Sequence, residues 1–329
     1  MKIILRVVPA AMAVLTACGT QAQTSAGSAA ENFPSRPLRI IVPFAPGGGS
    51  DIVSRLVGQR LAETLGQPVV VDNRPGASGN IGHAIGAKAA ADGYTILLGS
   101  SNFVVNPGLF QKNPYDALND FAPITYAASS PNVLTVHASF AARTIKEFIA
   151  LTKASPGKFN FASPGTGTTS HLAAALLKVD GGIDITHVPY NGAGPAVLAV
   201  LGNQVPIAIS GLPPIQPHIK SGVVRALGIT SPQRFSALPE VPTIAESGFP
   251  GFEADTPQMF LVPAGTPHAV IAKLNREIVR ILGLPEIKER FIGLGFETVA
   301  CSPEETTRRI RSDVAKWTKV IKLAGIQAE

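Results

Sequence analysis

Residues 38–51 read LRIIVPFAPGGGSD and carry the clearest indication of the fold. The apolar run 38–44 predicts a short strand, and the glycine-rich run 46–51 ends it. Apolar residues then recur at roughly helical spacing, at Ile52, Val53, Leu56, Val57 and Leu65. A strand that passes through a glycine loop into a helix is the repeating unit of an α/β fold with a parallel sheet.

This unit recurs along the chain. Further strands are predicted at 68–72, 94–98, 133–137, 159–163, 185–190, 205–210 and 225–230. Three more glycine-rich loops, at 73–82, 164–170 and 191–195, each precede a predicted helix. Beyond residue 263 the chain becomes helix-rich, at 269–282 and 303–323. The pattern predicts two α/β units and a C-terminal helical part, whose packing partner it does not indicate.

Composition narrows the class of protein. The chain has 329 residues, of which 45% are apolar and 15% charged, with 32 Gly and 28 Pro. It is too apolar for a disordered chain and too long for a disulfide-stapled mini-protein. The many Gly and Pro residues, without a collagen-like period, indicate frequent turns between short elements. Length favours two domains.

The first 30 residues have the pattern of an export signal. Lys2 and Arg6 precede an apolar run, 7–17, that is too short to span a membrane, and a small polar spacer follows. Two outcomes are open. Residues 15–18 (LTAC) resemble a bacterial lipobox, in which Cys18 becomes lipidated and anchors the protein, whereas cleavage near Ala22 or Ala26 releases a soluble protein.

Charge and cysteine content exclude further classes. The net charge of +6 falls to +4 once Lys2 and Arg6 are removed. Basic residues are scattered and form no run, so nucleic-acid binding is not expected. Cys301 is the only cysteine after Cys18, so no disulfide is expected in the exported domain.

The glycine loops predict an anion site. In open α/β sheets, ligands bind where strands end and helices begin, and the unpaired N–H groups of a helix start favour negative charge. Lys and Arg are absent from these loops except for Arg74. A carboxylate ligand is therefore expected to be held by N–H groups and hydroxyls. For Ser50, Asp51 and Ser170 an alternative is that each only caps its helix, and for Asp51 capping is the better expectation because a carboxylate repels an anion.

Motifs for catalysis and cofactors are missing. The run 47–51 (GGGSD) lacks the lysine of a P-loop, residues 165–167 do not extend to a dinucleotide fingerprint, and no G-x-S-x-G elbow occurs. The six histidines form no H-E-x-x-H motif and do not accompany a cysteine pair. We therefore expect no cofactor, no metal and no catalytic residue.

At this point the residues resemble a known family, the substrate-binding proteins of tripartite tricarboxylate transporters (the Bug/TctC family). The resemblance covers essentially all of residues 33–329. In the first half it rests on 33–37 (FPSRP), 41–51 (IVPFAPGGGSD), 72–76 (DNRPG), 80–82 (NIG), 92–95 (DGYT) and 106–107 (NP). In the second half it rests on 161–163 (FAS), 165–168 (GTGT), 170–172 (SHL), 187–190 (HVPY), 217–220 (PHIK), 238–243 (LPEVPT) and 263–267 (PAGTP).

The resemblance implies a two-lobe periplasmic-binding-protein (Venus flytrap) fold, each lobe a mostly parallel sheet flanked by helices. Residues 1–30 are then the signal peptide and spacer. Lobe 1 is discontinuous, 31–130 plus 256–329, and lobe 2 is 131–255. The chain is expected to cross between the lobes near 125–132 and 250–257, and these segments act as hinges.

By the family pattern, ligand-binding residues lie in loops of both lobes. In lobe 1 they are Pro46, Gly47, Gly48, Ser50, Asp51, Asn80, Ser100 and Asn106. In lobe 2 they are Ser163, Gly165, Thr166, Gly167, Thr168, Ser170, His171, Tyr190 and Gly192.

The implied function is the periplasmic capture of a small organic acid for membrane subunits of a tripartite tricarboxylate-type transporter, by a monomer that catalyses no reaction. Two departures from the family bear on the identity of the ligand. Ile209-Ser210-Gly211 lacks an acid that many members carry, which argues against amino-acid ligands, and 255–259 (DTPQM) lacks a common tryptophan. Two alternatives are a ligand-sensing module for a signalling protein and a secreted α/β hydrolase that uses Ser170 or His171.

Overall fold

Two β-sheets organise the residues that the structure, a computed structural model, describes, which are 32–327. The predicted signal segment and Cys18 lie outside these residues. The first sheet has the order β11-β4-β10-β3-β1-β2, made of β1 (Leu38–Val42), β2 (Val69–Asn73), β3 (Thr95–Gly99), β4 (Phe121–Ser130), β10 (Thr256–Pro263) and β11 (Glu297–Thr298). The second has the order β7-β6-β8-β5-β9, made of β5 (Asn132–His137), β6 (Phe159–Ser163), β7 (Ile185–Pro189), β8 (Ile207–Gly211) and β9 (Val224–Ile229).

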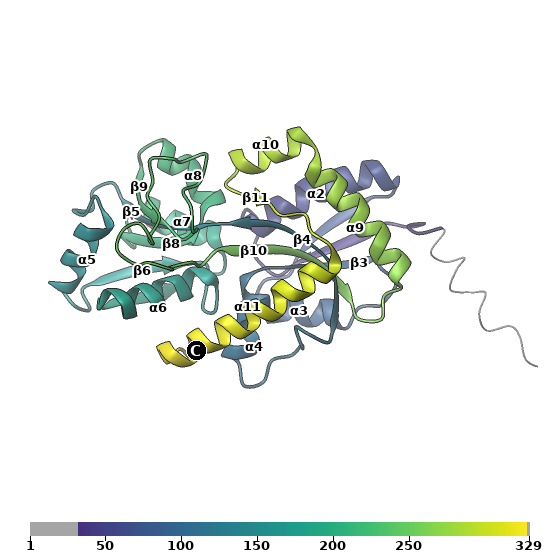
Figure 1. The fold of residues 1–329 in the computed structure, drawn as a ribbon, viewed down its shortest axis with the longest axis horizontal. Helices are drawn as coiled ribbons and strands as arrows, with labels where there is room; N and C mark the ends of the chain where they lie inside the picture. Colours follow the sequence, from purple (N-terminus) through teal and green to yellow (C-terminus); the bar gives the residue numbers. More distant parts are fainter. Residues whose placement is uncertain (1–31, 328–329) are drawn as a thin grey trace, which may run out of the picture. The chain divides into compact units, whose positions relative to one another are not determined.

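Helices flank both sheets, so each sheet with its helices forms one lobe (Figure 1). Those of the first lobe are α2 (Gly49–Leu65), the short η1 (Ala77–Gly79), α3 (Asn80–Ala87), α4 (Ser101–Leu109), α9 (His268–Gly283), α10 (Pro285–Gly293) and α11 (Pro303–Ala324). Those of the second are α5 (Ile145–Lys153), α6 (Thr169–Gly181), α7 (Ala193–Leu201) and α8 (Leu212–Lys220). The predicted α/β class is thus confirmed.

The prediction that each sheet is mostly parallel is wrong. Among the described strands, two of the five pairings in the first sheet and two of the four in the second are parallel. The cause is the path of the chain between the sheets. β4 and β10 pair antiparallel with each other in the first sheet, and β5 pairs antiparallel with β8 and β9 in the second.

The chain passes between the two sheets twice. Pro131 alone separates β4 from β5, and residues 230–255 lead from β9 back to β10. These passages fall at or beside the predicted hinges. The lobe boundaries at 130/131 and 255/256 and the hinge motion remain predictions.

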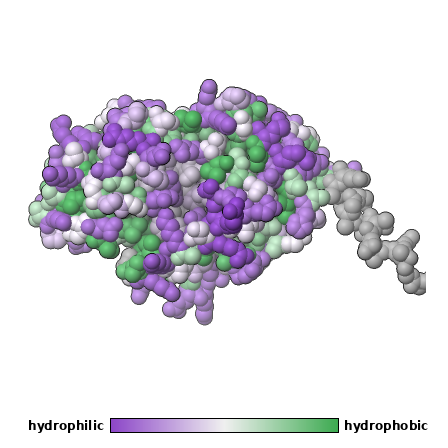
Figure 2. Space-filling view, in the orientation of Figure 1, coloured by the Kyte–Doolittle hydropathy of each residue, from purple (hydrophilic) through white to green (hydrophobic). Residues whose placement is uncertain are grey.

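The apolar core on each sheet follows the alternation of side chains along the strands. In the second lobe, Leu134 and Val136 belong to one buried cluster with the residues of α5 and α6, whereas Val133 belongs to another with those of α7 and α8. Figure 2 shows hydrophilic side chains over much of one face, with hydrophobic groups in smaller patches. Among the described helices, none combines the length and the apolar character needed to cross a bilayer.

Candidate ligand-binding site between the two lobes

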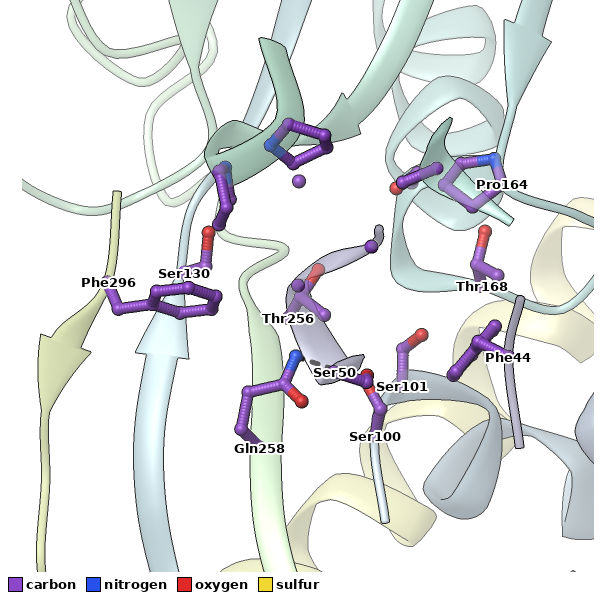
Figure 3. A pocket seen from close by; sticks show the side chains of 17 residues that line it. Phe44, Ser50, Ser100, Ser101, Ser130, Pro164, Thr168, Thr256, Gln258 and Phe296 are labelled. Carbon is purple, nitrogen blue, oxygen red and sulfur yellow. Dashed lines mark hydrogen bonds between the residues drawn. The ribbon is translucent and has the colours of Figure 1, made fainter. Parts of the chain in front are cut away.

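A cavity of about 50 Å³ lies between the lobes, and both lobes contribute to its wall (Figure 3). Ser50, Ser100 and Ser101 come from the first lobe, and Thr168 and Ser170 from the second. The strands that join the lobes also contribute, through Ser130, Thr256 and Gln258. We call this space the main cavity. Because room for one water needs roughly 10–15 Å³ on this measure, the main cavity can hold several ligand atoms.

Five helices begin at the wall of the main cavity, and this follows from the glycine loops after the strands. The wall contains Gly49 at the start of α2, Ser101 at the start of α4, Ala193 at the start of α7, Ser170 in the first turn of α6 and Pro213 in the first turn of α8. The first N–H groups of a helix have no partner inside the helix, and the helix dipole adds partial positive charge there. The starts of α2, α4, α6 and α7 are therefore suited to hold an anion, whereas α8 begins with Leu-Pro-Pro.

The walls of the main cavity carry no Lys, Arg, His, Asp or Glu side chain. Asp51 is close in sequence, but its carboxylate accepts hydrogen bonds from the Gly47 N–H at 3.1 Å, from Arg55 Nε at 2.9 Å and from Asn73 Nδ2 at 3.1 Å. Burial alone would raise the pKa of Asp51, but the bonds from Arg55, Gly47 and Asn73 hold it below the ordinary value. The positive potential inside the cavity therefore comes from the backbone.

One end of the main cavity is apolar. The helix α8 starts with Leu212-Pro213-Pro214; the Leu212 N–H is already bonded to the Pro131 carbonyl at 2.9 Å, and prolines have no N–H to offer. The ring of Phe296 lies beside them in the wall. A Cβ at Gly49 would sit 3.2 Å from Cζ of Phe296, so the glycine lets this ring approach the start of α2. A ligand thus meets donors on one side and hydrocarbon on the other.

A second space of about 170 Å³, the side cavity, shares Phe44, Pro164 and Thr168 with the main cavity. The predicted residues Gly165, Thr166 and Tyr190 line it, opposite Ser78, Gly79 and Asn102 of the first lobe. Asn102 donates from Nδ2 to the Ser78 carbonyl at 2.7 Å, while its buried Oδ1 has no protein partner. The side cavity extends the polar lining away from the apolar end.

The predicted site residues are therefore distributed over distinct places. Gly48, Ser50, Ser100, Thr168 and Ser170 line the main cavity, and Gly165, Thr166, Thr168 and Tyr190 line the side cavity. The remaining ones line neither: Pro46, Gly47, Asp51, Asn80, Asn106, Ser163, Gly167, His171 and Gly192. Direct ligand contact by any of them remains a prediction.

Several of these remaining residues hold the loops in place. Asn106 donates to Asn80 Oδ1 at 2.7 Å and to the Ser78 carbonyl at 2.9 Å, and so supports the loop around Ser78, whose φ is +52°. The Gly192 N–H donates to the Pro164 carbonyl at 2.9 Å, which ties the loop before α7 to the loop before α6. The arrangement gives them a supporting role behind the cavity walls.

The histidines near the second-lobe loops form a stacked pair outside the main cavity. The rings of His171 and His187 lie 4.0 Å apart and nearly parallel, and His187 Nε2 is 2.6 Å from Ser163 Oγ. Burial, with added repulsion from Lys178, lowers the pKa of His171 to about 4, and burial with His171 and Lys178 lowers that of His187 to about 3. Both rings are therefore neutral near pH 7.

This pair predicts acid sensitivity. Burial lowers both pKa values below the ordinary 6.5 of an unfolded histidine. Between about pH 6.5 and pH 4 the unfolded chain therefore binds more protons than the folded one, and the free energy of unfolding falls as the pH decreases. We expect this pair to contribute a loss of about 2–5 kcal/mol over that range. Urea unfolding of the parent and of His187→Asn at pH 7 and pH 4.5 measures it, and the variant should lose less stability than the parent.

The comparison with a variant is needed because two buried carboxyl groups change the stability of the folded protein with pH in the opposite direction. Burial raises the pKa of Asp255 to about 7 and that of Asp313 to about 6, so their protonation stabilises the folded protein as pH falls. His268→Asn, at an exposed position on α9, is the matched control and should follow the parent. An equal pH response of His187→Asn and the parent would contradict the prediction.

Sequence reasoning missed Gln258 and Phe296 as wall residues. The sequence does contain an indication for Gln258, because it is a polar residue inside the otherwise apolar run 257–263. In the structure it is only 2% exposed. For Phe296 the sequence contains no such indication, because it lies almost 250 residues from α2 along the chain. In the described part of the chain, no group of three or more His, Cys, Asp and Glu side chains is placed to hold a metal ion.

Solute-binding proteins have two lobes that are joined by crossing strands and that enclose a polar cavity, and this chain has the same arrangement. Solved members of this class resemble the chain over most of its length. An R. palustris protein solved with adipate has a TM-score of 0.87 and 34% identity, covering 90% of this chain and 99% of its own. MatC from Rhodopseudomonas palustris, solved with bound malate, has a TM-score of 0.84 and 31% identity, covering 88% and 100%.

The chain belongs to the tripartite tricarboxylate transporter family receptors (TctC), whose family model matches residues 53–326. BugT of Bordetella pertussis (strain Tohama I) is 39% identical over 298 residues, which are 90% of this chain and 91% of BugT. The resemblance to the Bug/TctC family and the two-lobe fold are thus confirmed. The members of this family are binding proteins and not enzymes.

Proposed function

We propose that the protein captures a small organic acid in the main cavity and catalyses no reaction. The observation that carries the proposal is the convergence of helix starts from both lobes on a cavity without charged side chains. Buried N–H donors of fixed direction bind a carboxylate strongly, because charge-assisted hydrogen bonds gain strength where water is excluded. Binding shifts an equilibrium between open and closed lobes.

The biological setting of the proposal comes from the family. Its members are receptors of tripartite tricarboxylate transporters, and two similar structures hold the carboxylates adipate and malate. We infer that this protein acts in the periplasm, as a monomer, and delivers its acid to membrane subunits of such a transporter. The export pattern of residues 1–30 supports this location.

The geometry gives no support to the hydrolase alternative. The Ser170 hydroxyl donates to Asn132 Oδ1 at 2.6 Å, not to a histidine. The His171 ring stacks on His187, and its Nδ1 accepts from the Gly167 N–H at 3.4 Å. A serine without a base in hydrogen-bond reach is not an activated nucleophile.

Thermal unfolding with a panel of monocarboxylates and dicarboxylates tests the proposal. An acid present at about 100 times its dissociation constant should stabilise the protein by about 2.7 kcal/mol and raise the melting temperature. Matched sugars and neutral dipeptides are the controls and should have no effect. A rise with a sugar or a peptide, but with no acid, would reject the carboxylate proposal.

A further inference from the structure

Gln258 is the one amide side chain in the wall of the main cavity. It lies on β10, the strand that returns the chain to the first sheet, and is 2% exposed. Figure 3 shows its amide group below Thr256 and beside Ser100. It therefore faces the space in which the ligand is proposed to lie.

A chain of hydrogen bonds fixes the orientation of this amide. Ser100 Oγ donates to the Pro257 carbonyl at 2.9 Å, so it can accept from Gln258 Nε2, which lies 3.4 Å away. The amide oxygen, Oε1, is then the free end, and it is buried without a protein partner. Buried acceptors are nearly always paired, so this oxygen requires a donor that the protein itself does not supply.

An ionised carboxylate cannot be that donor, because it only accepts hydrogen bonds. A ligand that fills the cavity and displaces its water therefore needs a second group that carries a proton. An ammonium group is unfavourable here, since helix starts supply positive potential and no acidic side chain lines the main cavity to pair with it. A hydroxyl group donates without adding charge and meets both conditions.

We propose that the ligand is a compact hydroxy acid and that Gln258 determines specificity by accepting a hydrogen bond from its hydroxyl group. The carboxylate lies against the helix starts, and the hydroxyl points to Gln258 Oε1. The cavity volume of about 50 Å³ suits a ligand of few carbons. This inference rests on the proposed function, namely that the cavity takes a carboxylate.

Calorimetric titration of the purified protein with matched pairs of acids tests it: L-malate against succinate, lactate against propionate, and 3-hydroxybutyrate against butyrate. In at least one pair the hydroxylated acid should bind at least tenfold more tightly, because its partner leaves the buried oxygen unpaired. If acids bind but none of the hydroxylated ones is preferred, the hydroxy-acid inference is overturned and the proposed function stands. If none of these acids and none of the panel binds, both are overturned.

Two variants test whether the preference for the hydroxylated acid depends on Gln258. Gln258→Leu keeps the volume and removes the acceptor, so the preference should fall below threefold, because the hydroxylated acid loses its acceptor and the unhydroxylated acid no longer leaves a buried oxygen unpaired. Gln216→Leu is the matched control: Gln216 is also 2% exposed and also has an unpartnered polar atom, but lies on α8 outside the wall of the main cavity. A tenfold preference that survives in Gln258→Leu would overturn the role of Gln258. If that variant does not fold, the parent's matched pairs decide.

Discussion

Ser101→Phe is expected to abolish the binding of organic acids by a folded protein. Ser101 is the first residue of α4, is 3% exposed and lines the main cavity, where Figure 3 shows its hydroxyl pointing inward. A phenyl ring there occupies the space of the ligand and covers the N–H groups at the start of α4. We expect the dissociation constant to rise at least about a hundredfold, which corresponds to the loss of two or more charge-assisted hydrogen bonds.

The fold should tolerate this ring because the cavity receives it. Overpacking a filled core costs about 1–3 kcal/mol, and a site beside an open cavity should lie at the low end. Calorimetric titration with the acid that stabilises the parent most gives the affinity, and thermal unfolding gives the stability. Ser101→Ala, which removes only the hydroxyl, is the control and should weaken binding tenfold at most. Unchanged affinity in Ser101→Phe would exclude the main cavity as the site.

Gly82→Ala is expected to destabilise the first lobe by about 1–3 kcal/mol. Gly82 lies in α3, where the helix approaches Pro43, just after β1, and Arg74, just after β2. A Cβ at this position would lie 2.8 Å from Cβ of Pro43, 2.9 Å from its Cα and 3.0 Å from the Arg74 carbonyl oxygen. Since two of these atoms belong to the backbone, no side-chain rotation can relieve the contact. Pro43 precedes Phe44 in the cavity wall, so ligand affinity should also fall.

Gly86→Ala in the same helix is the matched control. Its Cβ would approach only the side chain of Leu97, at 3.3–3.4 Å, and alanine gains about 1 kcal/mol of helix propensity over glycine. We expect its free energy of unfolding in urea to stay within about 1 kcal/mol of the parent. If Gly82→Ala is as stable as Gly86→Ala, the prediction is wrong, and α3 and Pro43 can accommodate a Cβ at position 82.

The helix starts of the site could be predicted from sequence because each depends on local chemistry. Glycine loops after apolar strands predicted where α2, α6 and α7 begin, and a family resemblance placed ligand contacts in the same loops. Their convergence on one cavity depends on which strands are neighbours, and this is decided by long-range pairing. The sequence therefore predicted which loops and helix starts form the site, but not how close to one another they lie.

The strands β4 and β10 escaped prediction for a physical reason. Residues 121–130 (FAPITYAASS) are rich in small residues and show no alternation, and 256–263 begins with Thr-Pro after a stretch of Gly and Pro. These strands pair with neighbours on both sides, so pairing and burial stabilise them more than local propensity does. Because they were missed, the first sheet was expected to be mostly parallel, and Gln258 on β10 was not placed in the wall. In the second sheet the strands were predicted, but the direction in which β5 pairs with β8 and β9 is a long-range property that local sequence does not show.

The helix starts around the main cavity offer N–H donors that belong to the backbone, and this separates two properties that many binding sites combine. A carboxylate held by an arginine can be lost by a single substitution, whereas N–H groups at helix starts persist through any substitution that leaves the helices in place, proline excepted. Side chains such as Gln258 and Phe296 can vary without removing these donors. Lineages built on this framework can therefore exchange one acid for another by point mutation while the ability to hold an acid is inherited unchanged.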